Sequence, residues 1–199
     1  MPLVIYVAPW FSETTVHYLE ALLDLPNVRL AVVSPDPQDH LTEHVRQRLS
    51  GHWRVGNMLD SDELTRAVAQ LSRHLGPVHR IFTHQEQFQV PLAAVRERLG
   101  ISGMKVEAAL NFRDKARMKE VLRAAGLPCA RHARVTDAAA AWRFVEEVGY
   151  PIVAKPVAGA ASQATMRIDG PDGLRAALSS YGPSAGNEML LEELVQGGA

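Results

Sequence analysis

Short apolar runs alternate with amphipathic stretches along the first hundred residues of the chain. The runs indicate strands at residues 3–8, 28–33, 52–55 and 78–83, and helical spacing of apolar side chains indicates helices at about 12–25, 39–49, 61–75 and 87–99. Continuous apolar strands separated by helices are typical of a parallel sheet covered on both faces. We therefore expect a doubly wound, Rossmann-like α/β domain over residues 1–103.

After Gly103 the pattern changes to shorter units. Linking helices are expected over residues 104–128, followed by strands near 130–135, 152–157, 165–168 and 188–195 and by helices near 137–148 and from 171 onward. The strands at 152–157 and 165–168 are separated by a short loop, which predicts a hairpin. We therefore expect a small α+β lobe over residues 129–199.

The first strand–helix turn excludes one common ligand of such sheets. It reads Ala8-Pro9-Trp10-Phe11-Ser12 and contains no glycine. The dinucleotide fingerprint needs glycines at this turn for close approach to the pyrophosphate. A site for NAD or FAD is therefore not expected there.

Composition and charge add limits on partners and location. The chain has 199 residues, a formal net charge of −1 and one cysteine, Cys129. A near-neutral chain does not favour nucleic acid or an anionic membrane, and a single cysteine excludes an internal disulfide. The start lacks the features of a signal peptide, and no apolar run is long enough to span a bilayer. We expect a cytoplasmic protein that binds neither nucleic acid nor membranes.

Lys155 is the residue that points most clearly to chemistry. It lies in the apolar run 150–157 and is followed by the small-residue loop 158–165. A buried ammonium group is costly unless an anion meets it, and a loop of small residues leaves room for phosphate oxygens. The alternative is a surface lysine on an edge strand, which Pro156 favours because proline is confined to sheet edges.

Three further segments carry candidate site residues, each with an alternative. Asp114-Lys115 opens a helix and either attracts an anion or is an N-cap followed by a solvated lysine. The strand ending at 192–195 either offers backbone groups to an adenine edge or carries a solvated pair of carboxylates. The segment 84–86 follows a strand, as substrate sites do in such sheets, or forms a polar turn.

Together these segments resemble the ATP-grasp superfamily. The shared order is Asp114-Lys115 at a helix start, a helix ending in Ala-Gly-Leu-Pro, the run 148–156 with Lys155 near its end, a small-residue loop, and Glu-Glu-Leu-Val at 192–195. The resemblance is specific over residues 111–198, and residues 1–110 fit the Rossmann-like domain that precedes this core. It looks most like the branch of amino acid ligases and biotin carboxylases.

The resemblance implies an ATP site and a reaction. ATP would phosphorylate a small-molecule carboxylate, and an amine or thiol would attack the acylphosphate. The implied ligands of ATP are Lys115 and Lys155 on the α- and β-phosphates, the loop Gly159–Thr165 with Gly159 and Ser162 over the phosphates, and Glu193 and Val195 on adenine with Glu192 and Leu194 beside them. Glu86 is a candidate for contact with the substrate.

The resemblance also implies that part of the machinery is not in this chain. The second ATP-grasp lobe, which supplies the ligands of Mg²⁺ in the family, is expected to be absent, so we expect no catalytic and no metal-binding residue here and no activity of the chain alone. Such a chain could be an excised piece, a proteolytic product or a natural truncation. The alternative function is a non-catalytic nucleotide-binding or interaction module derived from an ATP-grasp protein.

Exposure of the linking helices predicts self-association. In the family the apolar side of residues 104–128 would pack on the second lobe. Without that lobe the apolar side is open to solvent, and exposed apolar surface favours association. We therefore expect a homodimer or a domain-swapped oligomer.

Overall fold

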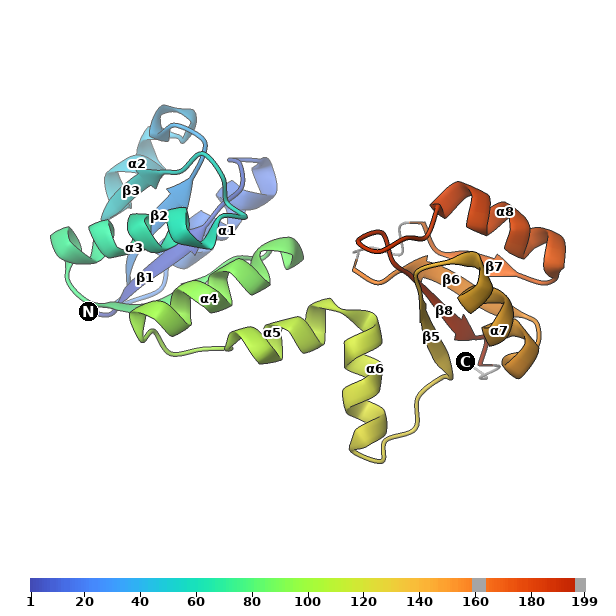
Figure 1. Ribbon diagram of the computed structural model, residues 1–199. Helices are drawn as coiled ribbons and strands as arrows, with labels where there is room; N and C mark the ends of the chain where they lie inside the picture. Colours follow the sequence, from blue (N-terminus) through green and yellow to red (C-terminus); the bar gives the residue numbers. More distant parts are fainter. Residues whose placement is uncertain (159–163, 196–199) are drawn as a thin grey trace. The chain divides into compact units, whose positions relative to one another are not determined.

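The computed structural model describes residues 1–158 and 164–195, and it divides into two compact units, Met1–Ala109 and Leu110–Ala199. Figure 1 shows the order of the elements along the chain. None of the helices in the described ranges is long and apolar enough to cross a membrane. Each unit is built around its own sheet, and the two are described separately below.

The first unit contains a four-stranded parallel sheet. Its strands are β1 (Leu3–Val7), β2 (Arg29–Ser34), β3 (Gly51–Arg54) and β4 (Val78–Phe82), in the order β3-β2-β1-β4. Every neighbouring pair is parallel. The side chains of β1 and β2 are almost all buried, which explains why these strands read as continuous apolar runs.

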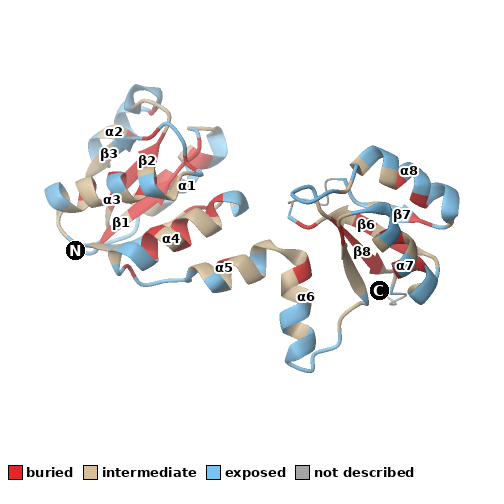
Figure 2. Cartoon of the chain, in the orientation of Figure 1, coloured by how far each residue is buried: buried red, intermediate tan, exposed pale blue. Residues whose placement is uncertain are grey.

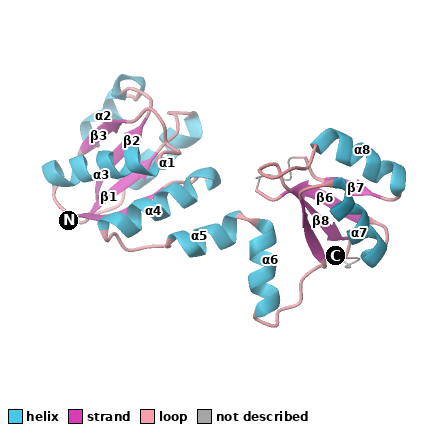
Figure 3. Ribbon diagram, in the orientation of Figure 1, coloured by secondary structure: helices cyan, strands magenta, loops and turns pink. Residues whose placement is uncertain are grey.

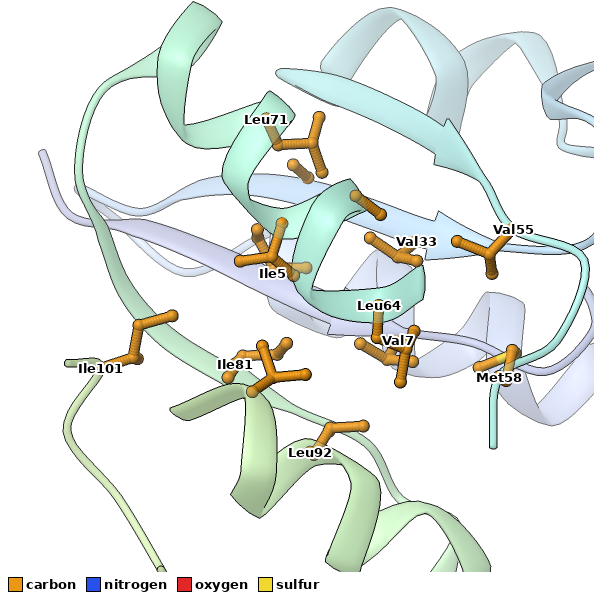
Figure 4. Close-up of a cluster of buried hydrophobic side chains, with 14 of the residues drawn as sticks. Ile5, Val7, Val33, Val55, Met58, Leu64, Leu71, Ile81, Leu92 and Ile101 are labelled. Atoms are coloured by element: carbon orange, nitrogen blue, oxygen red, sulfur yellow. The ribbon is translucent and has the colours of Figure 1, made fainter. Parts of the chain in front are cut away.

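Helices cover both faces of this sheet. They are α1 (Glu13–Leu23), α2 (Glu43–Arg48), α3 (Ser61–Leu75) and α4 (Gln89–Leu99), with short 3-10 turns at Gln38–His40 and Glu86–Phe88. Ile5 and Val7 pack with Leu64 of α3 and Leu92 of α4 (Figure 4). The other face, centred on Tyr6, packs against α1 and α2. The prediction of a doubly wound α/β domain is confirmed.

One predicted helix of this unit is wrong in extent. Residues 39–49 were expected to form a single polar helix. Instead, a 3-10 turn ends at His40, Leu41 is extended and buried, and Thr42 caps α2 by accepting a hydrogen bond from the Val45 N–H. The break follows from the cap: the Thr42 side chain takes the Val45 N–H, which in a single continuous helix would bond to the Leu41 carbonyl.

A buried arginine ties the segment after α4 to the edge of the sheet. Arg96 is 7% exposed, and its Nε and Nη2 donate to the Ile81 carbonyl of edge strand β4 at 3.1 and 2.8 Å. Its Nη1 donates to the Met104 carbonyl at 3.3 Å. The guanidinium thus covers part of an edge that would otherwise expose backbone groups.

The second unit is an antiparallel sheet with helices. Helix α5 (Val106–Arg113) contains the boundary and is followed by α6 (Lys115–Ala124), β5 (His132–Val135), α7 (Ala138–Val148), β6 (Ile152–Pro156), β7 (Met166–Ile168), α8 (Pro171–Tyr181) and β8 (Met189–Glu193). The strand order is β5-β8-β6-β7 (Figure 3). Side chains of α7 and α8 pack on one face of this sheet and form its core.

The structure contradicts the alternative that placed Lys155 on an edge strand. β6 is hydrogen-bonded to β8 on one side and to β7 on the other, so Lys155 lies in an interior strand. Pro156 is compatible with this position because it is the last residue of β6. Glu192 is likewise buried in an interior strand, β8, so the alternative of a solvated edge carboxylate is wrong for it. Figure 2 shows that most of β8 is buried.

Candidate functional site

The sheet of the second unit has an apolar face and a polar face. Ala154 belongs to the core with α7 and α8, so Lys155, the next residue of β6, points to the opposite face. The register pairs Lys155 with Leu190, and Glu192 follows two residues later on β8. Leu190 is also paired with Arg134 of β5. We call the face that carries Lys155, Glu192 and Arg134 the polar face.

A carboxylate lies between two lysines on the polar face. Glu192 Oε2 accepts a hydrogen bond from Lys155 Nζ at 2.7 Å, and Glu192 Oε1 lies 3.4 Å from Lys119 Nζ of α6. The side chains of Glu192 and Lys119 are each 11% exposed and that of Lys155 is 22% exposed. Oε1 is buried and receives no hydrogen bond in the described structure, so its contact with Lys119 is purely electrostatic. Two ammonium groups around one carboxylate leave one positive charge in excess.

The start of α6 is anchored beside the end of β6. The Lys115 N–H donates to the Val157 carbonyl at 3.1 Å, and Ala116, Val157 and Leu190 form a small buried apolar cluster. Lys115 therefore begins a helix that is fixed against the strand carrying Lys155. The first N–H groups of α6 are already bonded, to Val157 and to Asp114, so the groups here that favour an anion are the two neighbouring lysines, Lys119 and Lys155.

Asp114 caps α6 and joins it to the polar face. Its Oδ1 accepts hydrogen bonds from the backbone N–H groups of Ala116 and Arg117, both at 3.0 Å, and its Oδ2 accepts one from Arg134 at 2.6 Å. Arg134 also pairs with Glu188. Burial alone would raise the pKa of Asp114, but these hydrogen bonds and the Arg134 guanidinium outweigh it and lower the pKa.

The end of β8 is held from both sides. The Glu193 N–H donates to the Arg131 carbonyl at 3.0 Å, and the Leu194 N–H donates to the Pro151 carbonyl at 3.3 Å. The Glu193 carboxylate accepts from the Arg131 backbone N–H at 2.7 Å and from Arg131 Nε at 2.6 Å, and these contacts lower its pKa. Val195 lies beyond the strand and is 64% exposed.

The structure brings most of the predicted ATP ligands to this unit in definite places. Lys155 and Glu192 are in contact, Lys115 starts α6, and Glu193, Leu194 and Val195 form and follow the end of β8. Gly159 and Ser162 lie outside the described residues. Sequence analysis missed Lys119 and Arg134. Lys119 follows Lys115 by one helical turn, but nothing in the sequence indicates that this side of α6 meets Glu192.

The first unit has a second candidate position at the carboxyl ends of its strands. β1 and β4 are neighbours, while the chain leaves β1 toward β2 on the other side. Ligands of open α/β sheets bind at such a switch point. Trp10, which follows β1, is 47% exposed, and Glu86, in the turn after β4, is exposed. Glu86 therefore lies where the sequence predicted a substrate contact.

An uncharged aromatic cluster supports this turn. The Tyr6 hydroxyl is hydrogen-bonded to His84 Nδ1, and the Tyr18 ring stacks on the His84 ring with centroids 4.9 Å apart. Burial lowers the pKa of His84 and raises the pKa of Tyr6 to about 12, so both side chains are neutral near pH 7. We infer that the cluster orders the turn that carries Glu86. Neither Tyr6 nor Tyr18 had a signal in the sequence.

Glu192→Gln should destabilise the second unit. The change leaves two poorly solvated ammonium groups without their counter-charge, and breaking a buried pair in this way is costly. We expect a loss of on the order of 2–3 kcal/mol in the free energy of unfolding, measured by urea denaturation. Glu188→Gln is the matched control, because Glu188 pairs with Arg134 at a more exposed position. It should cost under about 1 kcal/mol, and equal losses in the two variants would contradict this role of Glu192.

Asp114→Asn should make the second unit less stable in a pH-dependent way. The folded pKa of Asp114 is below its ordinary value of 3.8, so the carboxylate stabilises the fold above that pH and its contribution disappears as the pH falls through the folded pKa. We expect a loss of about 1 kcal/mol at pH 7 for this partly exposed group. Urea denaturation at several pH values measures it. A difference between the two proteins that stays constant down to pH 2 would refute the assignment.

Comparison with known proteins gives partial matches in sequence and nearly complete matches in fold. No family model matches the chain. Alanine–anticapsin ligase of Bacillus subtilis (strain 168) is 34% identical over 95 residues, which is 48% of this chain and 20% of that protein. The chain thus covers only a small part of this curated relative.

Solved structures match over almost all of the chain, and two of them serve as examples. The L-amino acid ligase of Bacillus licheniformis has a TM-score of 0.74 and 15% identity, and the match covers 99% of this chain and 45% of that one. The biotin carboxylase domain of the Hydrogenobacter thermophilus 2-oxoglutarate carboxylase, solved with MgADP, ADP and bicarbonate, has a TM-score of 0.74 and 19% identity, with coverage of 98% and 44%. Likeness at this level of identity shows a shared fold.

Proposed function

We propose that this chain, which has the fold of the amino-terminal half of the ATP-grasp ligases, is part of an ATP-dependent carboxylate–amine or carboxylate–thiol ligase. The resemblance seen in the sequence is confirmed for the fold, since both solved neighbours align over nearly the whole chain. The chain spans about 45% of those proteins, so the activity of the whole enzyme is part of the proposal.

The observation that carries the proposal is the cluster of Lys119, Glu192 and Lys155 beside the start of α6. It is built on interior strands and an anchored helix, and it holds one excess positive charge in a poorly solvated place. A phosphate group is an anion that such a site would stabilise. The ADP bound to the structural neighbour makes a nucleotide phosphate the natural choice.

In this proposal ATP lies along the polar face. Lys155 and Lys115 neutralise the α- and β-phosphates, and the loop Gly159–Thr165 closes over them. The Glu193 carbonyl and the Val195 N–H hold the adenine edge, with Glu192 and Leu194 beside them. The hydrogen bonds from the end of β8 to Arg131 and Pro151 support the proposed adenine contact, because a strand that binds adenine through its backbone must be held in a fixed place.

In the proposed reaction, Lys115 and Lys155 act by electrostatic stabilisation. A substrate carboxylate oxygen attacks the γ-phosphorus, the bond to the β–γ bridging oxygen breaks, and ADP leaves. An amine or thiol then attacks the acyl carbon and displaces phosphate. Lys115 and Lys155 stabilise the charge that develops on the leaving ADP, and neither has to transfer a proton.

The proposed reaction also uses Mg²⁺, whose ligands we place outside this chain. Among the described residues, no three or more histidine, cysteine or acidic side chains are placed to hold a metal ion. We therefore place the ligands of Mg²⁺ in the portion of the longer enzymes that this chain does not cover. When bound, the ion would offset phosphoryl charge.

An amino acid is the substrate class that we propose. The name of one relative, alanine–anticapsin ligase, contains an amino acid, and that of one structural neighbour is L-amino acid ligase. In this chain the exposed Glu86, ordered by the neutral cluster of Tyr6, Tyr18 and His84, is a carboxylate at the switch point of the first sheet. It would attract a substrate ammonium group.

Lys155→Met should weaken ATP binding by about 10- to 100-fold, which corresponds to about 1–3 kcal/mol for a charge-assisted contact. Calorimetric titration of the 199-residue chain with ATP measures it. Glu192 keeps Lys119 as a counter-charge in this variant, so the fold should survive, and urea denaturation checks this. Lys105→Met in the first unit removes the same charge and is the control. Equal ATP affinity in both variants would rule out Lys155 as a ligand.

Ligation should depend on both substrates and on the whole enzyme. For the longest natural protein that contains this chain, we expect release of phosphate from ATP when an amino acid carboxylate and an amino acid amine are both supplied. The 199-residue chain alone should show no turnover. Phosphate release that is independent of any amino acid would contradict the ligase, and peptide formation by the 199-residue chain would contradict the need for further residues.

A further inference from the structure

A groove outside the proposed ATP site is rich in arginine. It lies in the second unit between α7, the start of β5 and the segment after α6, and has a volume of about 600 Å³. Its charged lining residues are Arg123, Arg131, Arg143 and Glu147. We call it the arginine groove. It belongs to a single compact unit, so its shape does not depend on any other part of the chain.

The charges of the arginine groove are not balanced. Three guanidinium groups line it, and one of them, that of Arg131, is paired with Glu193, which leaves Arg123 and Arg143 against the one lining carboxylate, that of Glu147. Among the described residues, the exposed Arg143 makes no hydrogen bond or ion pair, and the one hydrogen bond of the Arg123 guanidinium is with His132 Nδ1, at 3.3 Å. Burial lowers the pKa of His132, so this ring is neutral and adds no charge. Guanidinium groups with unused donors are suited to phosphate or carboxylate.

The floor of the arginine groove is apolar. Phe144, which is 5% exposed, and Val148 lie on the same side of α7 as Arg143 and Glu147, and Ala133 of β5 completes the floor. Small-ligand sites combine an apolar wall with a few placed polar groups. The combination fits an anionic head joined to an apolar body better than an inorganic ion. A bounded groove on a near-neutral chain also differs from the long basic stripe that nucleic acid requires.

Arg131 links this groove to β8. Its backbone N–H and Nε hold the two oxygens of Glu193, and its Nη1 reaches the Glu147 carbonyl at 3.5 Å. An anion that engages the remaining donors of Arg131 therefore acts on a side chain that also fixes the end of β8. Glu193 N–H is bonded to the Arg131 carbonyl, so the backbones of the two residues move together.

We propose that the arginine groove binds a small organic phosphate or carboxylate, with its anionic head against Arg123, Arg131 and Arg143 and its apolar body against Phe144. Occupancy of the groove changes the affinity of the chain for ATP through the Arg131–Glu193 pair. This second part rests on the proposed ATP site, whereas binding in the groove does not.

Phenyl phosphate is the probe for binding, titrated calorimetrically into the chain carrying Lys155→Met so that the proposed ATP site contributes little. Saturable binding should be at least about fivefold weaker when Arg143→Ala or Arg123→Ala is added, since each removes a charge-assisted contact at a partly exposed site. Arg175→Ala, on α8 and paired with Asp172, should leave it unchanged. Inorganic phosphate should bind more weakly than phenyl phosphate.

Binding in the groove would be refuted by an absence of saturable phenyl phosphate binding, or by a loss of affinity in Arg175→Ala equal to that in the groove variants. A parallel titration with benzoate tests whether a carboxylate head group binds as well as a phosphate. The coupling is measured as the ratio of two Kd values for ATP, one with and one without saturating phenyl phosphate. In the unmodified chain these two values should differ by about threefold or more, and in Glu193→Gln their ratio should approach one. A ratio of one in the unmodified chain overturns the coupling. Phenyl phosphate binding in a chain that does not bind ATP would leave the groove standing and refute the proposed function.

Discussion

The organisation of the second unit depends on one buried carboxylate. Glu192 lies on an interior strand and faces Lys155 of the neighbouring strand and Lys119 of α6, so a single side chain ties two strands and a helix together. An ion cluster with little solvent is stable only if its geometry is good and its partners are fixed. The rest of the site supplies that fixation, through the cap of Asp114 on α6 and the contact of Lys115 with Val157.

The same constraint is the reason that we propose a ligand for this cluster and not a purely structural role. Glu192 balances one of the two lysines beside it, and on the same face Asp114 and Glu188 share one cation, Arg134. An additional cation lowers stability unless an anion joins it, and proteins tolerate such a cost mainly at functional sites. In the proposed complex a phosphate would occupy that place, and Lys155 would keep its carboxylate partner while it binds.

Sequence analysis predicted the elements well because their signals are local. The apolar runs at β1 and β2, the cap at Asp114, and the hairpin of β6 and β7 all follow from residues close together in the chain. What it missed is set by distant pairing. Pro156 favoured an edge strand because proline is mostly confined to sheet edges, and only the placement of β8 beside β6 shows that this proline ends an interior strand. The contact of Lys119 with Glu192 joins residues that are far apart in sequence, so no spacing rule could find it.

The two carboxylates at the end of β8 show how the period of a strand divides the unit into two regions. Successive side chains of a strand point to opposite faces, so Glu192 reaches the lysines of the polar face and Glu193 turns away toward Arg131. The strand that is proposed to hold adenine is thereby anchored by opposite charges on both sides. A shift of one residue in its register would exchange the two carboxylates and break both anchors at once. Because these anchors lie in adjacent residues of one strand, the coupling that we propose between the groove at Arg131 and the polar face would pass through a single peptide unit.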